Sequence, residues 1–274
     1  MCLFFMKKVK TYFLCLWLLV MPCFFYGQHL EVQRFNHAKI ELFVRHCHFS
    51  AVSQNKTRFP WFSREVCYKN LLGTIDKDFV NVTFVLDTFY PMKGNHFVKN
   101  QNKYKVLEIK EGSEARSFLR LIDFIAGLRL DPETIIYIVE DDYLHRAGWI
   151  DILLEGFSIP DVSYVTLYDH KDKYFYPMYD QLESKLYHTK SCHWRVTPST
   201  TNTYAMKFKT LLRDLYTHRR YSLNLDVSSD HAKFCDLSSQ GKFLISPMPG
   251  WSTHLEPEYA SPCINWEEIH NAYR

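Results

Sequence analysis

The stretch Ile135–Tyr143 has the sequence IIYIVEDDY, in which five apolar residues run directly into three consecutive carboxylates. A short apolar run rich in β-branched residues predicts a buried strand. The carboxylates of Glu140, Asp141 and Asp142 repel one another and resist ionising together unless water or a cation compensates them. The residues alone therefore leave two interpretations open: a solvated acidic turn after a strand, or a site for a divalent cation, which prefers oxygen ligands.

The segments around this stretch predict an α/β fold with a mostly parallel sheet flanked by helices. At 274 residues the chain is long enough for one large domain. Strands and helices alternate along it, which favours a parallel sheet covered by helices. We expect strands at 39–49, 80–89, 135–143, 162–170 and 203–208, helices at 63–75, 148–157 and 209–220, and a short strand, a turn at Gly112 and a helix within 103–130.

Composition and charge argue against a nucleic-acid-binding protein. The net charge is only +3, and the 33 Lys and Arg residues are spread among 30 Asp and Glu rather than gathered into a block. An electrostatic footprint for nucleic acid is therefore missing. The sequence also contains no Walker-type or G-x-G-x-x-G phosphate loop.

The first thirty residues have the layout of a targeting segment. Lys7, Lys8 and Lys10 precede a run without Asp, Glu, Lys or Arg from Thr11 to Leu30. This predicts a signal peptide or a type II signal anchor at 1–30, followed by a single domain at 31–274. The positive-inside rule then places the body on the non-cytoplasmic side, either membrane-anchored or in the secretory pathway.

Acidic residues end two of the expected strands. Asp87 closes the strand at 80–89, and Glu140 to Asp142 close the strand at 135–143. In open α/β sheets, ligands bind beyond the carboxyl ends of the strands. Both groups are therefore candidates for one site.

Together these residues resemble glycosyltransferases of the GT-A fold, particularly the family-2-like ones. Members carry a D-x-D or E-D-D motif after an apolar strand, and the motif holds the metal that bridges the donor's diphosphate. The resemblance implies a GT-A-like, Rossmann-like fold and a divalent cation, Mn²⁺ or Mg²⁺. It makes Asp142 the direct metal ligand, with Glu140 and Asp141 contacting the donor's ribose, water or the metal.

The likeness covers most of the chain after the first thirty residues. Asp87 matches the family's acidic residue that meets the nucleoside, and Gly112 lies in a turn similar to the one that opens a helix toward the donor. The segment 228–249 is similar to the family's acidic motif, helix and final strand, which makes Asp230 the general base. His254 stands where many members carry a C-terminal histidine that also contacts the metal.

Each of these roles has a simpler alternative. Asp230 could be the N-cap of the helix that begins near His231, and its role could be confused with that of Asp226. His254 could be an ordinary hydrogen-bonded loop histidine.

The acceptor side is predicted at one short segment. His193, Trp194 and Arg195 could form an acceptor platform, with the tryptophan stacking on a sugar face and the arginine on phosphate. Taken by itself, Trp194 fits buried aromatic packing better than it fits a platform.

The resemblance implies transfer of a sugar from a nucleotide-sugar donor to a hydroxyl of a glycan, lipid or protein acceptor. A cation offsets charge on the departing diphosphate, and one carboxylate takes the proton of the acceptor hydroxyl. Two other classes stay open: a metal-dependent hydrolase, and a non-catalytic carbohydrate-binding ectodomain.

Overall fold

The computed structural model describes residues 40–50, 52–91 and 94–274. The predicted targeting segment at 1–30 lies outside these residues, so it stays a prediction. None of the helices in the described ranges is long and apolar enough to cross a membrane.

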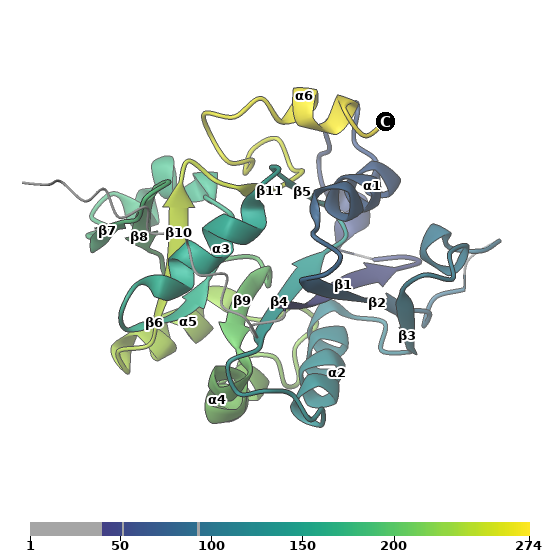
Figure 1. The fold of residues 1–274 in the computed structure, drawn as a ribbon, viewed down its shortest axis with the longest axis horizontal. Coiled ribbons are helices and arrows are strands. Elements are labelled where there is room, and N and C mark those ends of the chain that lie inside the picture. The colour runs from purple at the N-terminus through teal and green to yellow at the C-terminus, as the bar shows by residue number, and fades with distance from the viewer. Residues whose placement is uncertain (1–39, 51, 92–93) are drawn as a thin grey trace, which may run out of the picture. The chain divides into compact units, whose positions relative to one another are not determined.

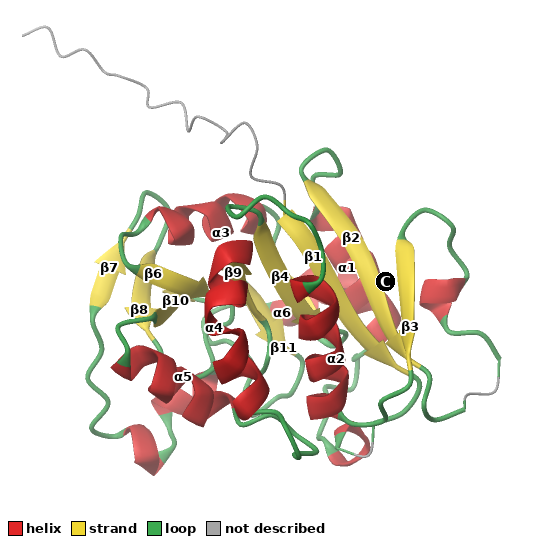
Figure 2. Ribbon diagram, turned by 90° about the horizontal axis from the view of Figure 1, so that it is seen from below, coloured by secondary structure: helices red, strands yellow, loops and turns green. Residues whose placement is uncertain are grey.

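A nine-stranded sheet runs through the centre of the described protein (Figures 1 and 2). All of its strands except β8 and β9 point in one direction, so the predicted mostly parallel sheet is confirmed. The arrangement is consistent with the GT-A-like, Rossmann-like fold that we expected. In spatial order the strands are β3 (Lys105–Ile109), β2 (Val80–Asp87), β1 (Ile40–Cys47), β4 (Ile135–Glu140), β9 (Tyr204–Lys207), β6 (Val162–Val165), β10 (Phe243–Met248), β8 (His193–Val196) and β7 (Leu186–His188).

Helices cover both faces of this sheet, which explains why β4 is apolar from Ile135 to Val139. Strand β4 sends Tyr137 and Val139 into one core cluster and Ile136 and Ile138 into the other. This is the alternation expected for a strand buried on both faces. Helices α1 (Arg64–Thr74) and α3 (Trp149–Ser158) contribute to the first cluster, and α2 (Glu114–Ala126), α4 (Phe208–Arg220) and α5 (Asp230–Ser239) to the second.

A two-stranded sheet lies beside the end of β4 and was not predicted. The strand expected at 135–143 ends at Glu140, and after a two-residue turn the chain forms β5 (Tyr143–His145). β5 pairs antiparallel with β11 (Ser252–His254), in a register that sets His254 opposite Tyr143. The strand expected at 162–170 likewise ends early, at Val165.

Short elements complete the fold. Helix α6 (Trp266–Asn271) packs in a third small core cluster with β5 and the chain before α1. The 3₁₀ turns are η1 (Ser53–Asn55), η2 (Phe97–Lys99), η3 (Lys171–Tyr174) and η4 (Pro177–Tyr179).

Candidate metal and donor site

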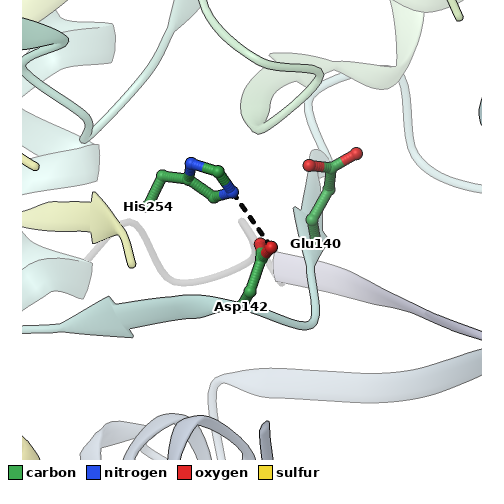
Figure 3. Close-up of side chains that lie close together, drawn as sticks. All are labelled: Glu140, Asp142 and His254. Atoms are coloured by element: carbon green, nitrogen blue, oxygen red, sulfur yellow. Dashed lines mark hydrogen bonds and ion pairs between the residues drawn. The ribbon is translucent and has the colours of Figure 1, made fainter. Parts of the chain in front are cut away.

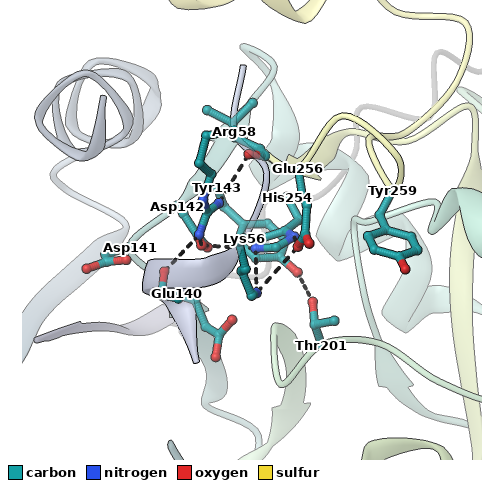
Figure 4. A network of polar contacts seen from close by, with 12 residues as sticks. Lys56, Arg58, Glu140, Asp141, Asp142, Tyr143, Thr201, His254, Glu256 and Tyr259 are labelled. Carbon is teal, nitrogen blue, oxygen red and sulfur yellow. Dashed lines mark hydrogen bonds and ion pairs between the residues drawn. The ribbon is translucent and has the colours of Figure 1, made fainter. Parts of the chain in front are cut away.

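The three carboxylates at the end of β4 face different cations. The turn after Glu140 directs the two aspartates to different sides, and in Figure 4 Asp141 points away from Asp142. Repulsion between the acids is therefore offset pair by pair. The arginine partners are Arg45, whose Nη1 is 3.4 Å from Glu140 Oε1; Arg64, whose Nε is 3.0 Å from Asp141 Oδ1; and Arg58, whose Nη2 is 2.7 Å from Asp142 Oδ2.

Burial and these neighbours move the pKa values of the acids in opposite directions. Burial raises the pKa of Glu140 to about 8; Arg45 opposes the rise and nearby acids add to it. Burial alone would also raise the pKa of Asp142, but His254 and Arg58 outweigh it and hold that pKa well below its usual range. The pKa of Asp141 is lowered as well, so near neutral pH both aspartates of the motif are ionised.

Glu140, Asp142 and His254 form a group that could hold a metal ion (Figure 3). One ligand atom from each residue lies within 4.8 Å of those of the other two. The pairing of β11 with β5 brings His254 Nε2 to 2.9 Å from Asp142 Oδ2. Asp142 Oδ1 is buried and has no hydrogen-bond partner among the described residues. Two carboxylates and an imidazole could hold a divalent cation, and the carboxylate oxygens are ligands of the kind that Mn²⁺ and Mg²⁺ prefer.

Two cationic side chains from the segment after β1 lie against the same group (Figure 4). Arg58 binds Asp142 Oδ2, and Lys56 Nζ lies 3.4 Å from His254 Nε2 and 3.5 Å from Glu256 Oε2. Glu256 Oε2 is also 3.3 Å from His254 Nδ1. Protein cations thus face the carboxylate and imidazole atoms that a metal ion would use.

Asp87 and Gly112, both predicted to meet the donor, are linked to each other. The Asp87 carboxylate accepts hydrogen bonds from the backbone N–H groups of Phe89, Glu111 and Gly112, at 3.0, 3.1 and 2.8 Å. Gly112 has a φ of +73°, and a Cβ there would lie 2.4 Å from Phe89 Cδ1. Asp87 therefore fixes the turn that leads into α2, and contact with a nucleoside stays a prediction.

A chain of hydrogen bonds joins the predicted base to the acidic motif. Asp230 Oδ2 accepts a short bond from the backbone N–H of Asn202, whose side-chain Nδ2 donates to Glu114 Oε1 at 2.7 Å. Arg45 Nη1 donates to the same Glu114 oxygen at 2.9 Å and lies 3.4 Å from Glu140. Burial raises the pKa of Asp230 above its ordinary value. The structure thus brings Asp230 and Glu140 into one polar network.

Of the two alternatives to Asp230 as the base, the N-cap is contradicted and Asp226 stays open. The residue in the N-cap position of α5 is Ser229, and Asp230 is the first residue of the helix, so the expectation of an Asp230 N-cap is wrong. Asp226 is exposed, and its backbone carbonyl accepts a hydrogen bond from Ala115. The role of Asp230 as a base itself stays a prediction.

The three predicted acceptor residues lie on β8, and none of them forms a hydrogen bond or ion pair with Glu140, Asp142 or His254. Trp194 is fully buried in the first core cluster, so the core-packing alternative describes it better than a stacking platform does. Arg195 is paired with the buried Asp169 at 2.6 Å, and His193 is exposed on the other side of the strand from Trp194.

Sequence reasoning missed the basic half of the site. Arg45, Arg58 and Arg64 each pair with one acid of the motif, and Glu114 accepts hydrogen bonds from both Arg45 and Asn202. Arg45 could have been found, because a charged residue within a largely buried strand needs a buried partner. Arg58 lies in a segment without a motif, and nothing in the sequence pairs it with Asp142.

No protein-family model matches the chain, and no curated protein matches it. Among solved structures, the chain is similar to the crystal structure of S. aureus TarS 1–349, at a TM-score of 0.44 and 10% sequence identity. The matched region covers 76% of this chain and 57% of that structure, so the chain spans just over half the length of the TarS structure. At this distance the likeness assigns no function, and the functional conclusion depends on the site itself.

Proposed function

We propose that the protein is a metal-dependent glycosyltransferase that moves a sugar from a nucleotide-sugar donor to a hydroxyl acceptor. One observation carries the proposal: Glu140, Asp142 and His254 place ligand atoms within 4.8 Å of one another. They do so at the carboxyl end of a central parallel strand, the position at which open α/β sheets bind ligands.

The candidate metal group would supply one half of the chemistry. A bound divalent cation offsets negative charge on a departing diphosphate. Asp142 and His254 would hold the ion with Glu140, and the buried Asp142 Oδ1 has no other partner among the described residues. Arg58 and Lys56 lie against the same atoms and would add positive charge for the phosphates.

Asp230 would supply the other half by taking the proton of the acceptor hydroxyl as that oxygen bonds to the sugar. A general base works best when its pKa lies closer to the working pH than that of a free carboxylate. Burial raises the pKa of Asp230 in that direction. Asn202 and Lys233 hold both of its carboxylate oxygens in place.

The remaining parts of the proposal rest on the sequence. The acceptor is proposed to be a glycan, a lipid or a protein hydroxyl. The segment 1–30 is proposed to act as a signal peptide or a type II anchor, with residues 31–274 on the non-cytoplasmic side of the membrane.

The test is a thermal-shift screen of UDP-, GDP- and CDP-sugars with and without Mn²⁺. A ligand at 100 times its Kd stabilises the folded state by about 2.7 kcal/mol, so a true donor should raise the midpoint temperature of thermal unfolding. The variant D142N should lose the Mn²⁺-dependent part of this shift. D172N is the matched control, because Asp172 is similarly buried and ion-paired, with Lys173 at 3.0 Å.

Turnover assays separate the proposal from its competitors. Donor cleavage that is unaffected by any added acceptor would indicate a hydrolase. Binding of glycans without turnover of any donor would indicate a carbohydrate-binding protein. If no nucleotide sugar binds with Mn²⁺ present, or if D142N binds it as well as D172N does, the proposal fails.

A further inference from the structure

Lys233 is a fully buried lysine that contacts the predicted base. It lies on α5, its side chain has no exposed surface, and its Nζ is 2.7 Å from Asp230 Oδ1. The same nitrogen donates to Asn202 Oδ1 at 2.7 Å and to the Tyr204 hydroxyl at 3.3 Å. An ammonium group has three hydrogens and no acceptor. Three acceptors surround this one, so the site satisfies the charged form of Lys233 completely.

The hydrogen bonds continue from Lys233 through the second core cluster. Tyr204 on β9 has its hydroxyl 3.2 Å from Nδ1 of His218 on α4. His218 Nε2 is 3.3 Å from the hydroxyl of Tyr164 on β6, and that hydroxyl donates to Asp214 Oδ2 at 2.6 Å. Five residues on four elements thus form one continuous buried chain, which we call the Lys233–Asp214 chain.

The chemistry of the two ends leaves one direction for the hydrogens. A carboxylate only accepts, so the single hydroxyl hydrogen of Tyr164 goes to Asp214, and Tyr164 accepts from His218 Nε2–H. Burial, aided by Lys233, lowers the pKa of His218 to about 3, so the ring is neutral and its Nδ1 accepts from Tyr204. Tyr204 must then accept from Lys233, which the ammonium provides.

Both ends of the chain carry fixed charges. At the far end, burial alone would raise the pKa of Asp214, but hydrogen bonds from Arg213, Lys242 and Tyr164 outweigh it and lower that pKa. At the near end, the charged groups that face Asp230 are Lys233 on its own helix and Glu114 on α2. Lys233 favours the carboxylate form of Asp230, whereas Glu114 and burial disfavour it.

We propose that Asp214, acting through Tyr164, His218 and Tyr204, is a positioning residue that holds the Lys233 ammonium oriented against Asp230. The importance of this for turnover rests on the proposed function, in which Asp230 is the base. The existence of the Lys233–Asp214 chain does not depend on the proposed function. Each hydrogen bond is polarised by the next in a buried chain, so a change at Asp214 alters the hydrogen bond that Lys233 donates to Tyr204.

The test observes the ammonium of Lys233 directly and needs no substrate. A buried, fully hydrogen-bonded ammonium exchanges slowly with water, so Lys233 should give a protected ¹H–¹⁵N signal, assigned by its absence in K233M. Cutting the chain with Y204F should expose this signal to exchange. Removing the far charge with D214N, or the last hydroxyl with Y164F if D214N folds poorly, should shift it. Y137F is the matched control, because Tyr137 is an equally buried tyrosine that bonds a buried histidine, His145, outside the chain.

The outcomes are decisive in both directions. A signal that shifts in D214N or Y164F and stays in place in Y137F supports the inference. The absence of a protected ammonium in the wild type, or a signal unchanged by Y204F and by D214N or Y164F, overturns it. Where turnover is measurable, Y204F should also move the pH profile of kcat while Y137F leaves it in place; a merely structural role would lower stability without moving the profile.

Discussion

Replacing His145 with glutamine is expected to remove one acid-sensitive contribution to stability. His145 is fully buried on β5, with its Nε2 2.8 Å from the Tyr137 hydroxyl. Burial lowers its pKa from 6.5 to about 3, so the folded protein holds a neutral ring. In the unfolded chain, His145 takes up a proton once the pH falls below the ordinary imidazole pKa of 6.5. This contribution is therefore complete at high pH and is lost as the pH falls from 6.5 toward 3.

The size of the effect follows from the unfolded state. At pH 5, one and a half units below the ordinary imidazole pKa, protonation stabilises the unfolded chain by about 2 kcal/mol, at about 1.4 kcal/mol per unit. The result holds for any folded pKa well below 5, and the structure gives about 3. H145Q lacks this contribution. The difference in unfolding free energy, wild type minus H145Q, should therefore fall by about 2 kcal/mol between pH 7 and pH 5.

Urea denaturation at the two pH values measures this difference. Using the difference cancels other titrating groups, including Glu140, whose raised pKa acts with the opposite sign. H188Q is the control, since His188 is exposed on β7 and should leave the difference unchanged. A pH-independent difference for H145Q would show that His145 is solvated or charged in the folded protein, and the argument from burial would fail.

Two further predictions concern the turn at Gly112 and the cations of the site. G112A and G241A should each lower the free energy of unfolding by about 1–2 kcal/mol, because both glycines have a positive φ. The loss should be larger for G112A, because its new Cβ also contacts Phe89. The new Cβ of G241A has no neighbour within 4 Å. Equal losses in urea denaturation would contradict this reasoning. R58M should bind Mn²⁺ about ten- to hundredfold more tightly in a spin-resonance titration, because a charge-assisted hydrogen bond of about 1.5–3 kcal/mol no longer competes for Asp142. Unchanged or weaker binding would mean that Arg58 does not compete with the ion.

The sequence was sufficient for the elements with long apolar patterns. IIYIVE is a central strand, and Phe118, Leu121, Ile122 and Ile125 do line the buried face of α2. Such patterns are read correctly because burial on a sheet or helix face requires them. The three-residue strands β5 and β11 were missed because a pattern of period two needs more residues than they contain.

The site was predictable only where a residue type carries its own signal. The acids of the motif were found from their position after a strand, and His254 was found from the family resemblance. The partners of these residues were not found, because ion pairs such as Arg58 with Asp142 join positions that no local pattern relates. The prediction of an acceptor platform required Trp194 to lie on the surface, but the sheet buries its side chain.

The pairing of β11 with β5 has a consequence for the order in which the protein becomes competent. His254 follows Asp142 by 112 residues, and Lys56 precedes His254 by 198. A ribosome-bound chain that has already folded its first parallel strands therefore presents the acidic motif without its imidazole partner. The three-residue group Glu140, Asp142 and His254 is therefore complete only after Ser252–His254 has been synthesised and has paired with β5.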